Sequence, residues 1–351
     1  MRITKVTQLI VSLLIILGVL LSACAQAVET EAPLEEPVVE EPAAEEPAVE
    51  EPASEEPVAG ELTKIRFAAF TGEETVPIYV AQQEGILAKH GVEADIIPVA
   101  SAQEKDQLIA VGEADCEQGE LLTVITANQD EIIKQNLFIS IQPSETHPKF
   151  TILVAGNSGI ESLEDLKGVE IGTSENSIVE YITTRILERN GFSKEDIKYL
   201  SVPRIPDRMA LIQSGELKAG SMQSSLAEMA VQQGAVIIAD DSKYPEITQM
   251  TWACRKDFID ANPEAVRGFI AAIAEAVEII NKDPQAYKAL AVENNLIPVP
   301  LQEIYVMPVF PMPAVPTREG FEDVYQWALE RGIVTNENIA YEDTIRPELL
   351  P

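Results

Sequence analysis

Two segments of the chain repeat one order of strand-like and helix-like runs, and each ends in the motif LIxxGE. In the first segment these runs are 64–70 (strand), 76–89 (helix), 94–99 (strand) and 102–111 (helix). In the second they are 169–173, 177–190, 197–202 and 207–214. Each motif precedes a short strand and then a polar cluster that opens a helix. This alternation predicts parallel βαβ units, and we expect two similar α/β lobes. The alternative is that any two βαβ units look alike.

The length of the segment after residue 61 agrees with two lobes. Residues 62–351 are too many for one small domain and enough for two of roughly 100 to 150 residues each. We expect lobe 1 to comprise 62–155 plus 248–351, and lobe 2 to comprise 156–247. Helical patterns at 263–281 and 319–331, and a proline-rich loop at 297–316, are interpreted as scaffold.

The first 23 residues have the pattern of a signal peptide. Arg2 and Lys5 precede an apolar run at 9–23, which is short for a membrane-spanning helix. The end of this run, Leu-Ser-Ala followed by Cys24, resembles the bacterial lipobox, in which the cysteine is lipidated and becomes the first mature residue. The resemblance implies a protein outside the cytoplasm, lipid-anchored to the bacterial cell membrane, either at the cell surface or in the periplasm. A plain signal peptide with an accidental cysteine and an uncleaved anchor helix are the alternatives.

An acidic repeat follows the cysteine. Residues 35–59 are five copies of a five-residue unit that begins EEP, and 28–61 contain 13 Glu and no Lys or Arg. Such a sequence cannot bury a core, so we expect residues 24–61 to form a disordered stalk. The 25 repeat residues would reach on the order of 80 Å.

The rest of the chain is also acidic. The formal net charge is −33, of which the stalk carries −13 and the leader +2, so residues 62–351 carry −22. Repulsion from phosphates and anionic headgroups argues against nucleic acid as a partner. Cys116 and Cys254 are the cysteines that remain. They could pair in a secreted chain or stay as two separate buried thiols.

Four stretches of sequence resemble ABC-transporter substrate-binding proteins of the branch that serves nitrate, sulfonates, taurine and thiamine-pyrimidine precursors. They are IRFAAFTGEETVPIYVAQQEGILAKHGVEADIIPV at 65–99, QLIAVGEAD at 107–115, GIESLEDLKGVEIGT at 159–173 and RKDFIDANPEAVRGFIAAIAEA at 255–276. The resemblance implies a type II periplasmic-binding-protein-like α/β fold, with two lobes joined by a hinge and a ligand in the cleft. It also implies a monomer without cofactor or metal that passes a small solute to an ABC permease with its ATPase. Many relatives have a Trp-Glu-Pro-like run where this chain has SMQSS at 221–225, so no relative's ligand is carried over.

Candidate ligand-binding residues follow the predicted strands, because ligands of α/β sheets bind beyond the carboxyl ends of strands and near helix N-termini. They come from loops 70–75, 116–120, 143–147, 173–177 and 223–225, and from one tryptophan near the expected return crossing. They are Thr71, Gly72, Glu73, Glu117, Gln118, His147, Ser174, Asn176, Ser177, Gln223, Ser224 and Trp252. The loops at 173–177 and 223–225 are favoured, although ordinary helix caps would look similar. Trp252 either stacks on a planar ligand or packs in the core.

The charges in these loops favour a neutral or cationic solute, such as an aromatic heterocycle. The loops contain six glutamates and no Lys or Arg, namely Glu73, Glu74, Glu117, Glu120, Glu145 and Glu175. Arg204 and Arg208 follow a strand of the second segment and could also reach the cleft. We interpret them instead as solvent-facing residues of a helix-capping turn.

The sequence predicts a binding protein rather than an enzyme. Its two histidines, His90 and His147, lie in different segments, and no GxSxG motif, P-loop or zinc-ligand spacing is present. One relative of the implied fold makes a thiamine pyrimidine by consuming its own histidine, a role that His147 could imitate. A solute-sensing protein that signals to a membrane receptor is the other alternative.

Overall fold

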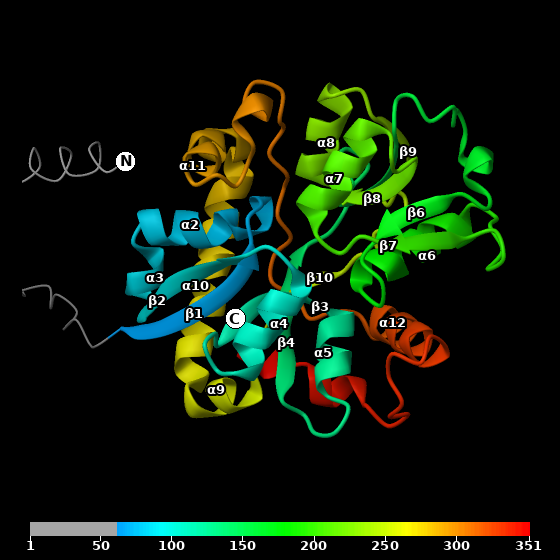
Figure 1. The fold of residues 1–351 in the computed structure, drawn as a ribbon. Helices are drawn as coiled ribbons and strands as arrows, with labels where there is room; N and C mark the ends of the chain where they lie inside the picture. The colour runs from blue at the N-terminus through cyan, green and yellow to red at the C-terminus, as the bar shows by residue number, and fades with distance from the viewer. Residues whose placement is uncertain (1–61) are drawn as a thin grey trace, which may run out of the picture. The chain divides into compact units, whose positions relative to one another are not determined.

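The strands form two five-stranded sheets, each at the centre of one α/β lobe (Figure 1). The computed structural model describes residues 62–351. The predicted signal peptide, the lipidation site Cys24 and the acidic stalk lie outside the described residues. We call the part built on the sheet with β1 lobe 1, and the part built on the sheet with β6 lobe 2.

The sheet of lobe 1 has the strand order β2-β1-β3-β10-β4. Its strands are β1 (Thr63–Phe70), β2 (Val92–Val99), β3 (Cys116–Glu120), β4 (Lys134–Ile141) and β10 (Met250–Arg255). β1 pairs in parallel with β2 and β3, whereas β10 runs antiparallel to β3 and β4. β10 is the first strand of lobe 1 after the chain returns from lobe 2.

The sheet of lobe 2 repeats this arrangement with the order β7-β6-β8-β5-β9. Its strands are β5 (Phe150–Val154), β6 (Glu170–Thr173), β7 (Lys198–Ser201), β8 (Ala219–Gln223) and β9 (Val236–Asp240). β6 pairs in parallel with β7 and β8, and β5 runs antiparallel to β8 and β9. The predicted pair of similar α/β lobes is therefore confirmed. β5 belongs to the second sheet, so the chain crosses between sheets before residue 150, earlier than the expected boundary at 155.

The helices connect the parallel strands and cover the sheets. Between the strands of lobe 1 lie α2 (Val76–Gln83), α3 (Ile86–Lys89), α4 (Ala102–Ala110) and α5 (Leu121–Ala127). Those of lobe 2 are α6 (Ile178–Arg189), α7 (Ile205–Ser214) and α8 (Ser224–Gln232). After β10 come α9 (Lys256–Ala261), α10 (Pro263–Lys282), α11 (Lys288–Glu293) and α12 (Arg318–Glu330). No helix within 62–351 has the length and apolar character needed to cross a membrane.

The single helix predicted at 76–89 is wrong in one respect, because it is two helices. Gly85 adopts the left-handed conformation with φ of 70° between α2 and α3. A right-handed helix cannot continue through this conformation, which glycine adopts at little cost. The proline-rich segment 297–316 is irregular as expected, apart from the short 3-10 helix η5 (Val299–Leu301).

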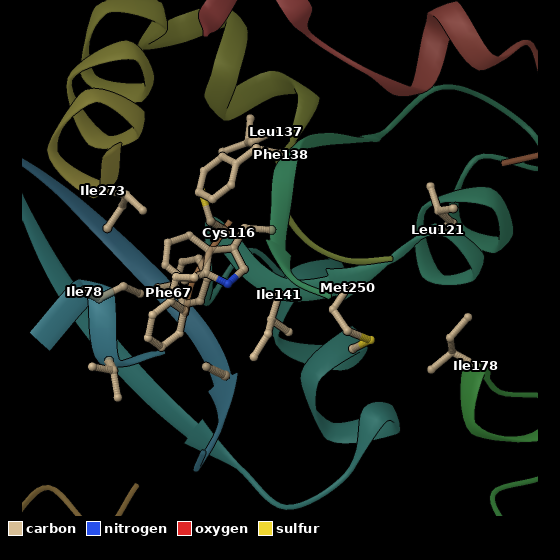
Figure 2. Packing of buried hydrophobic residues seen from close by; sticks show 14 of the residues in the cluster. Phe67, Ile78, Cys116, Leu121, Leu137, Phe138, Ile141, Ile178, Met250 and Ile273 are labelled. Atoms are coloured by element: carbon tan, nitrogen blue, oxygen red, sulfur yellow. The ribbon is translucent and has the colours of Figure 1, made fainter. Parts of the chain in front are cut away.

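The core of lobe 1 is centred on an aromatic cluster. The ring of Trp252 lies 4.9 Å from Phe67, 5.1 Å from Phe138 and 5.7 Å from Phe269. Phe67 comes from β1, Phe138 from β4 and Phe269 from α10, so the cluster joins the sheet to its longest covering helix. Figure 2 shows Phe67 and Phe138 within this packing, with the aliphatic side chains around them.

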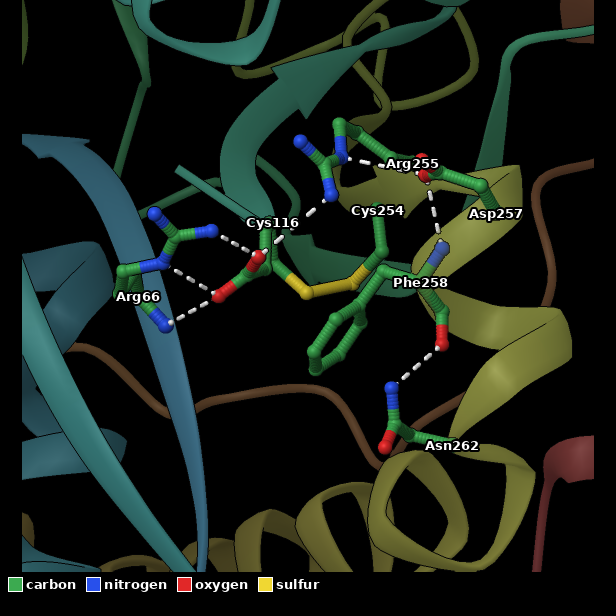
Figure 3. The surroundings of a disulfide bond; sticks show 8 residues. Arg66, Cys116, Cys254, Arg255, Asp257, Phe258 and Asn262 are labelled. Atoms are coloured by element: carbon green, nitrogen blue, oxygen red, sulfur yellow. Dashed lines mark hydrogen bonds and ion pairs between the residues drawn. A yellow bond between two sulfur atoms is a disulfide. The ribbon is translucent and has the colours of Figure 1, made fainter. Parts of the chain in front are cut away.

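Cys116 and Cys254 form a disulfide between β3 and β10 (Figure 3). The two residues are directly opposite in the antiparallel register. The preceding residue, Asp115, receives hydrogen bonds from the guanidinium of Arg66 at 2.9 and 2.5 Å. The alternative left open by the sequence is settled in favour of pairing, and the returning strand is covalently fixed to its neighbour.

The two crossings between the sheets are hydrogen-bonded to each other. The backbone N–H of Lys149 donates to Asp241 Oδ1 at 2.8 Å, and the N–H of Asp241 donates to the carbonyl of Phe150 at 3.1 Å. Thr248 also donates to Asp241 Oδ2 at 2.8 Å. These contacts place the outgoing and returning chain side by side, as expected for a double-stranded hinge.

Candidate functional site

A small cavity lies between the two lobes. Side chains from both lobes line it, and its volume is about 50 Å³. From lobe 1 they are Phe70, Ala100, Ser101, Ala102, Glu120 and Met250, and from lobe 2 they are Ser174, Ser177, Ile178, Val179, Pro203, Ile205 and Gln223. This volume holds a few water molecules and is far below the roughly 300 Å³ of a typical organic-ligand site. An organic solute therefore requires the lobes to part.

The cavity is bounded by the carboxyl ends of the six parallel strands. In lobe 1, β1 and β3 end at Phe70 and Glu120, and Ala100 follows β2. In lobe 2, Ser174 follows β6, Pro203 lies two residues after β7, and Gln223 ends β8. This is the position at which α/β sheets bind ligands, and here two such edges face each other.

Three predicted site residues line this cavity, and all three belong to lobe 2. Ser177 caps α6, with its Oγ accepting from Val179 N at 3.2 Å and donating to the carbonyl of Ser174 at 2.6 Å. Ser174 Oγ donates to the carbonyl of Pro203 at 3.2 Å. The side-chain amide of Gln223 makes no hydrogen bond within residues 62–351, so it is available to a ligand.

Glu120 is the charged side chain of the lining, and it is paired. Its Oε2 lies 3.4 Å from the Nζ of Lys105, which also donates to the carbonyl of Gln118 at 2.8 Å. Thr123 donates to the other carboxylate oxygen. Burial works against the charged form of Lys105, but the carboxylates of Glu117 and Glu120 outweigh it and raise the Lys105 pKa. Lys105 therefore stays protonated and positively charged beside Glu120.

The other buried glutamates near the cleft also have lysine partners. Lys134 Nζ lies 2.7 Å from Glu117 Oε1. Lys149 Nζ lies 3.1 Å from Glu73 Oε1 and 3.3 Å from Glu74 Oε1. Burial alone would raise the pKa of Glu73, but Lys149 outweighs it and the pKa is lowered, whereas burial raises the pKa of Glu74.

These pairs correct the charge argument drawn from the sequence. Lysines 105, 134 and 149, from segments outside the candidate loops, neutralise Glu73, Glu117 and Glu120, and Glu145 and Glu175 are exposed. Glu74 shares Lys149 with Glu73, so four buried glutamates face three lysines and most of the negative charge that favoured a neutral or cationic solute is compensated. The prediction that Arg208 faces solvent is wrong, because 1% of its surface is exposed. Arg204 faces solvent as predicted.

The remaining predicted residues of the loops do not line the cavity. Thr71 and Asn176 are exposed, and Gly72 lies in extended backbone before η2 (Glu73–Thr75). Gln118 is buried and accepts from the backbone N–H of Phe70 at 3.0 Å, which fixes the end of β1. Ser224 donates to the carbonyl of Pro148 and so joins α8 to the first crossing.

His147 and Trp252 also lie away from the cavity lining. His147 Nε2 is 2.6 Å from the carbonyl oxygen of Val306, and this contact fixes the first crossing to the proline-rich segment. Trp252 is 1% exposed in the aromatic cluster, which is the packing alternative given for it.

Sequence reasoning placed Phe70 in a candidate loop without naming it as a site residue, and it missed Ser101 and Met250. Ser101 caps α4 by accepting from Glu104 N at 3.2 Å, and it follows β2 as Ser174 follows β6. The LIxxGE repeat carried the signal for this residue, since it predicts that the loop after β2 belongs to the site. Nothing local distinguishes Phe70 or Met250 from other apolar strand residues.

Comparison with known proteins agrees with this geometry. A family profile described as NMT1/THI5 like matches residues 73–287, which include every cavity-lining residue except Phe70. The chain belongs to this family. The resemblance inferred from the sequence is therefore confirmed.

Two curated relatives of this chain differ from each other in activity. An aliphatic sulfonates-binding protein of Escherichia coli is 24% identical over 172 residues, covering 48% of this chain and 53% of the relative. The 4-amino-5-hydroxymethyl-2-methylpyrimidine phosphate synthase THI5 of Saccharomyces cerevisiae is 26% identical over 230 residues, covering 60% of this chain and 64% of the relative. The chain thus matches about half to two thirds of the length of these two relatives.

A solved structure gives the same fold. The alkanesulfonate-binding protein SsuA from Xanthomonas axonopodis pv. citri, bound to MOPS, is 13% identical with a TM-score of 0.68. The superposition covers 82% of this chain and 99% of that one. The predicted type II binding-protein fold is confirmed.

Proposed function

We propose that the protein captures a small organic solute outside the cytoplasm and delivers it to the permease and ATPase of an ABC importer. The observation that carries this proposal is one cavity bounded by the carboxyl ends of all six parallel strands, three from each lobe. The similarity to an aliphatic sulfonates-binding protein and to the alkanesulfonate-binding protein SsuA supports it.

The hinge gives the proposal a mechanism. The solute enters when the lobes part, and closure buries it between the two edges. A solute that contacts both lobes shifts the population toward the closed form, and the permease would distinguish this form from the open one. The three buried lysine–glutamate sites hold the glutamates in ion pairs and leave Gln223, Ser174 and Ser177 to contact the solute.

The cavity favours binding over chemistry. Its lining contains no histidine, cysteine or lysine, and its acid, Glu120, is held by Lys105 and Thr123. His147, the residue on which a pyrimidine-synthase reading depends, contacts Val306 instead. A synthase and a solute sensor are the alternative functions. Recovery of an altered solute would favour the first, and unimpaired solute uptake after deletion of the gene would favour the second.

The anchor belongs to the same proposal. A lipid on Cys24 and the acidic repeat would hold the lobes at the membrane surface, where a permease could be reached. Mass spectrometry of the mature N-terminal peptide should show acylated Cys24, and Cys24→Ser should release the protein from membranes. An unmodified Cys24 in the mature protein would refute the anchor and leave solute binding unaffected.

The test of solute binding is calorimetric titration of the full chain in detergent. The probes are short alkanesulfonates, taurine, nitrate and aminopyrimidines. We expect one class to bind with 1:1 stoichiometry and to be recovered unchanged. Gln223→Ala should weaken binding about tenfold through one lost hydrogen bond, whereas the exposed control Gln233→Ala should not. Absence of binding by every class would contradict the proposal.

A further inference from the structure

Arg208 is a buried cation without a partner. It lies in the first turns of α7 with 1% of its surface exposed. Its Nε and Nη1 atoms are fully buried and have no hydrogen-bond partner within residues 62–351. No carboxylate of the described chain is within ion-pair distance of its guanidinium.

The other buried cations show that this is an exception. Lys105, Lys134 and Lys149 each have at least one carboxylate within 3.4 Å. An unpaired buried charge destabilises a fold, because the hydration it loses is not replaced. Burial lowers the pKa of Arg208 to about 10, so the group still carries its charge at neutral pH. The described chain leaves one positive charge for which it provides no counter-charge.

Arg208 belongs to the helix whose first residues line the cavity. Pro203 and Ile205, just before and at the start of α7, line the cavity. Side chains on a helix lean toward its N-terminus, so the guanidinium of Arg208 extends toward that end of α7. Ser174 belongs to the same side of the lobe 2 sheet as Gly172, by strand alternation, and it also lines the cavity.

The sheet leaves room for this side chain. Gly220 on β8 lies under the stem of Arg208, because a Cβ added there would be 3.5 Å from Arg208 Cγ. The same Cβ would be 2.8 Å from Ile212 Cδ1, so a larger residue would displace α7 from the sheet. Gly172 pairs with Gly220 in the neighbouring strand and likewise carries no side chain.

We propose that Arg208 binds the anionic group of the solute, and that this solute is a small organic oxyanion with an apolar body. The anion would reach the guanidinium between the start of α7 and Ser174 when the lobes part. Phe70, Ile178 and Met250 would then enclose the apolar body. A planar oxyanion such as a carboxylate, or a sulfonate, can accept two hydrogen bonds from one guanidinium. The inference rests on the proposed function and adds the chemical class of the solute.

The experiment titrates the full chain in detergent with four probes of equal carbon number at pH 7.5. They are butane-1-sulfonate, butanoate, butan-1-ol and butylamine. We expect at least one of the two anions to bind and the alcohol and amine not to bind. Arg208→Met should lower the affinity for that anion about 10- to 100-fold. The exposed control Arg204→Met, which removes an equal charge beside the same helix, should leave it unchanged.

The melting temperature of the ligand-free protein separates a ligand-binding role from a structural one. Methionine in place of an unpaired buried charge should raise the melting temperature by at least about 2 °C, while a structural arginine would lower it when removed. Arg208→Lys keeps the positive charge but lacks the paired N–H donors of the guanidinium, so it should bind the anion with intermediate affinity. This variant preserves the test if Arg208→Met does not fold.

Two results would overturn the inference. One is binding of the alcohol or amine with no loss in Arg208→Met, which would leave the proposed solute-binding function standing. The other is failure of both anions to bind together with a lower melting temperature of Arg208→Met, which would assign the residue to the scaffold. The proposed function itself fails only if no class in its wider panel binds.

Discussion

Replacing Lys149 with methionine is expected to remove far more stability than the loss of a surface lysine. Lys149 precedes β5 at the first crossing, and its Nζ lies between Glu73 and Glu74 of lobe 1. All three residues are buried, with exposures of 4%, 4% and 1%. The substitution leaves two neighbouring carboxylates without a counter-charge. Breaking a buried pair in this way costs about 3–5 kcal/mol, or roughly 6–15 °C in melting temperature.

The loss should depend on pH in a defined direction. Without Lys149, burial and mutual repulsion raise the pKa of both carboxylates above their usual 4.5. A carboxylate with a raised folded-state pKa favours folding below its unfolded pKa and loses that contribution as pH rises through the folded pKa. The variant should therefore be closest to the wild type near pH 4.5 and furthest from it at pH 8.

Urea unfolding followed by tryptophan fluorescence at pH 8 and pH 5 measures both effects. Lys194→Met is the control, since Lys194 pairs with Glu330 at 2.8 Å with both side chains largely exposed, and its loss should change the stability far less. Adding Glu73→Gln and Glu74→Gln to Lys149→Met should restore much of the stability. A loss below about 1 kcal/mol at pH 8, or an equal loss at both pH values, would refute the reasoning.

Three further predictions concern single features. Replacing Cys116 and Cys254 with alanine should cost roughly 5 kcal/mol, because the bond closes a loop with a sequence separation of 138; reduction of the wild type should reproduce the loss in urea unfolding. Gly220→Ala should destabilise by about 1–3 kcal/mol in the same assay, since its Cβ meets Ile212, and a neutral effect would contradict the packing. Burial raises the pKa of Asp106 to about 6, so its contribution is present below pH 4 and lost as pH rises through 6; Asp106→Asn should flatten this part of the stability–pH curve, and an unchanged curve would argue against the shift.

The repeat of LIxxGE was enough to predict two similar lobes, but it did not predict which strands each sheet takes from the other half of the sequence. The two motifs gave matching βαβ units, and the two sheets do share one strand order. The fourth strand of each sheet, β10 or β5, pairs antiparallel after a crossing, and no local pattern states which sheet a strand joins. The helix break at Gly85 had a local signal in the glycine itself, which apolar periodicity outweighed.

The site was predictable in position and not in charge. Loops after strands contain Ser174, Ser177 and Gln223, and these residues do line the cavity. The partners of the glutamates come from helices and strand ends up to 76 residues away, so the loops read alone looked uniformly acidic. Arg208 looked like a residue of an exposed turn because its burial depends on Gly220, which lies on strand β8 and not in the same turn.

The interleaved strands set an order of assembly as the chain emerges from its N-terminus. Lobe 2 uses one continuous stretch, β5 to β9 (residues 150–240), and so has all its strands before residue 250 appears. Lobe 1 lacks β10, which lies between β3 and β4, until that later residue arrives. Domains generally fold as units when their sequence is complete. Lobe 2 is therefore expected to be complete before lobe 1, and the Cys116–Cys254 bond can close only after β10 has arrived.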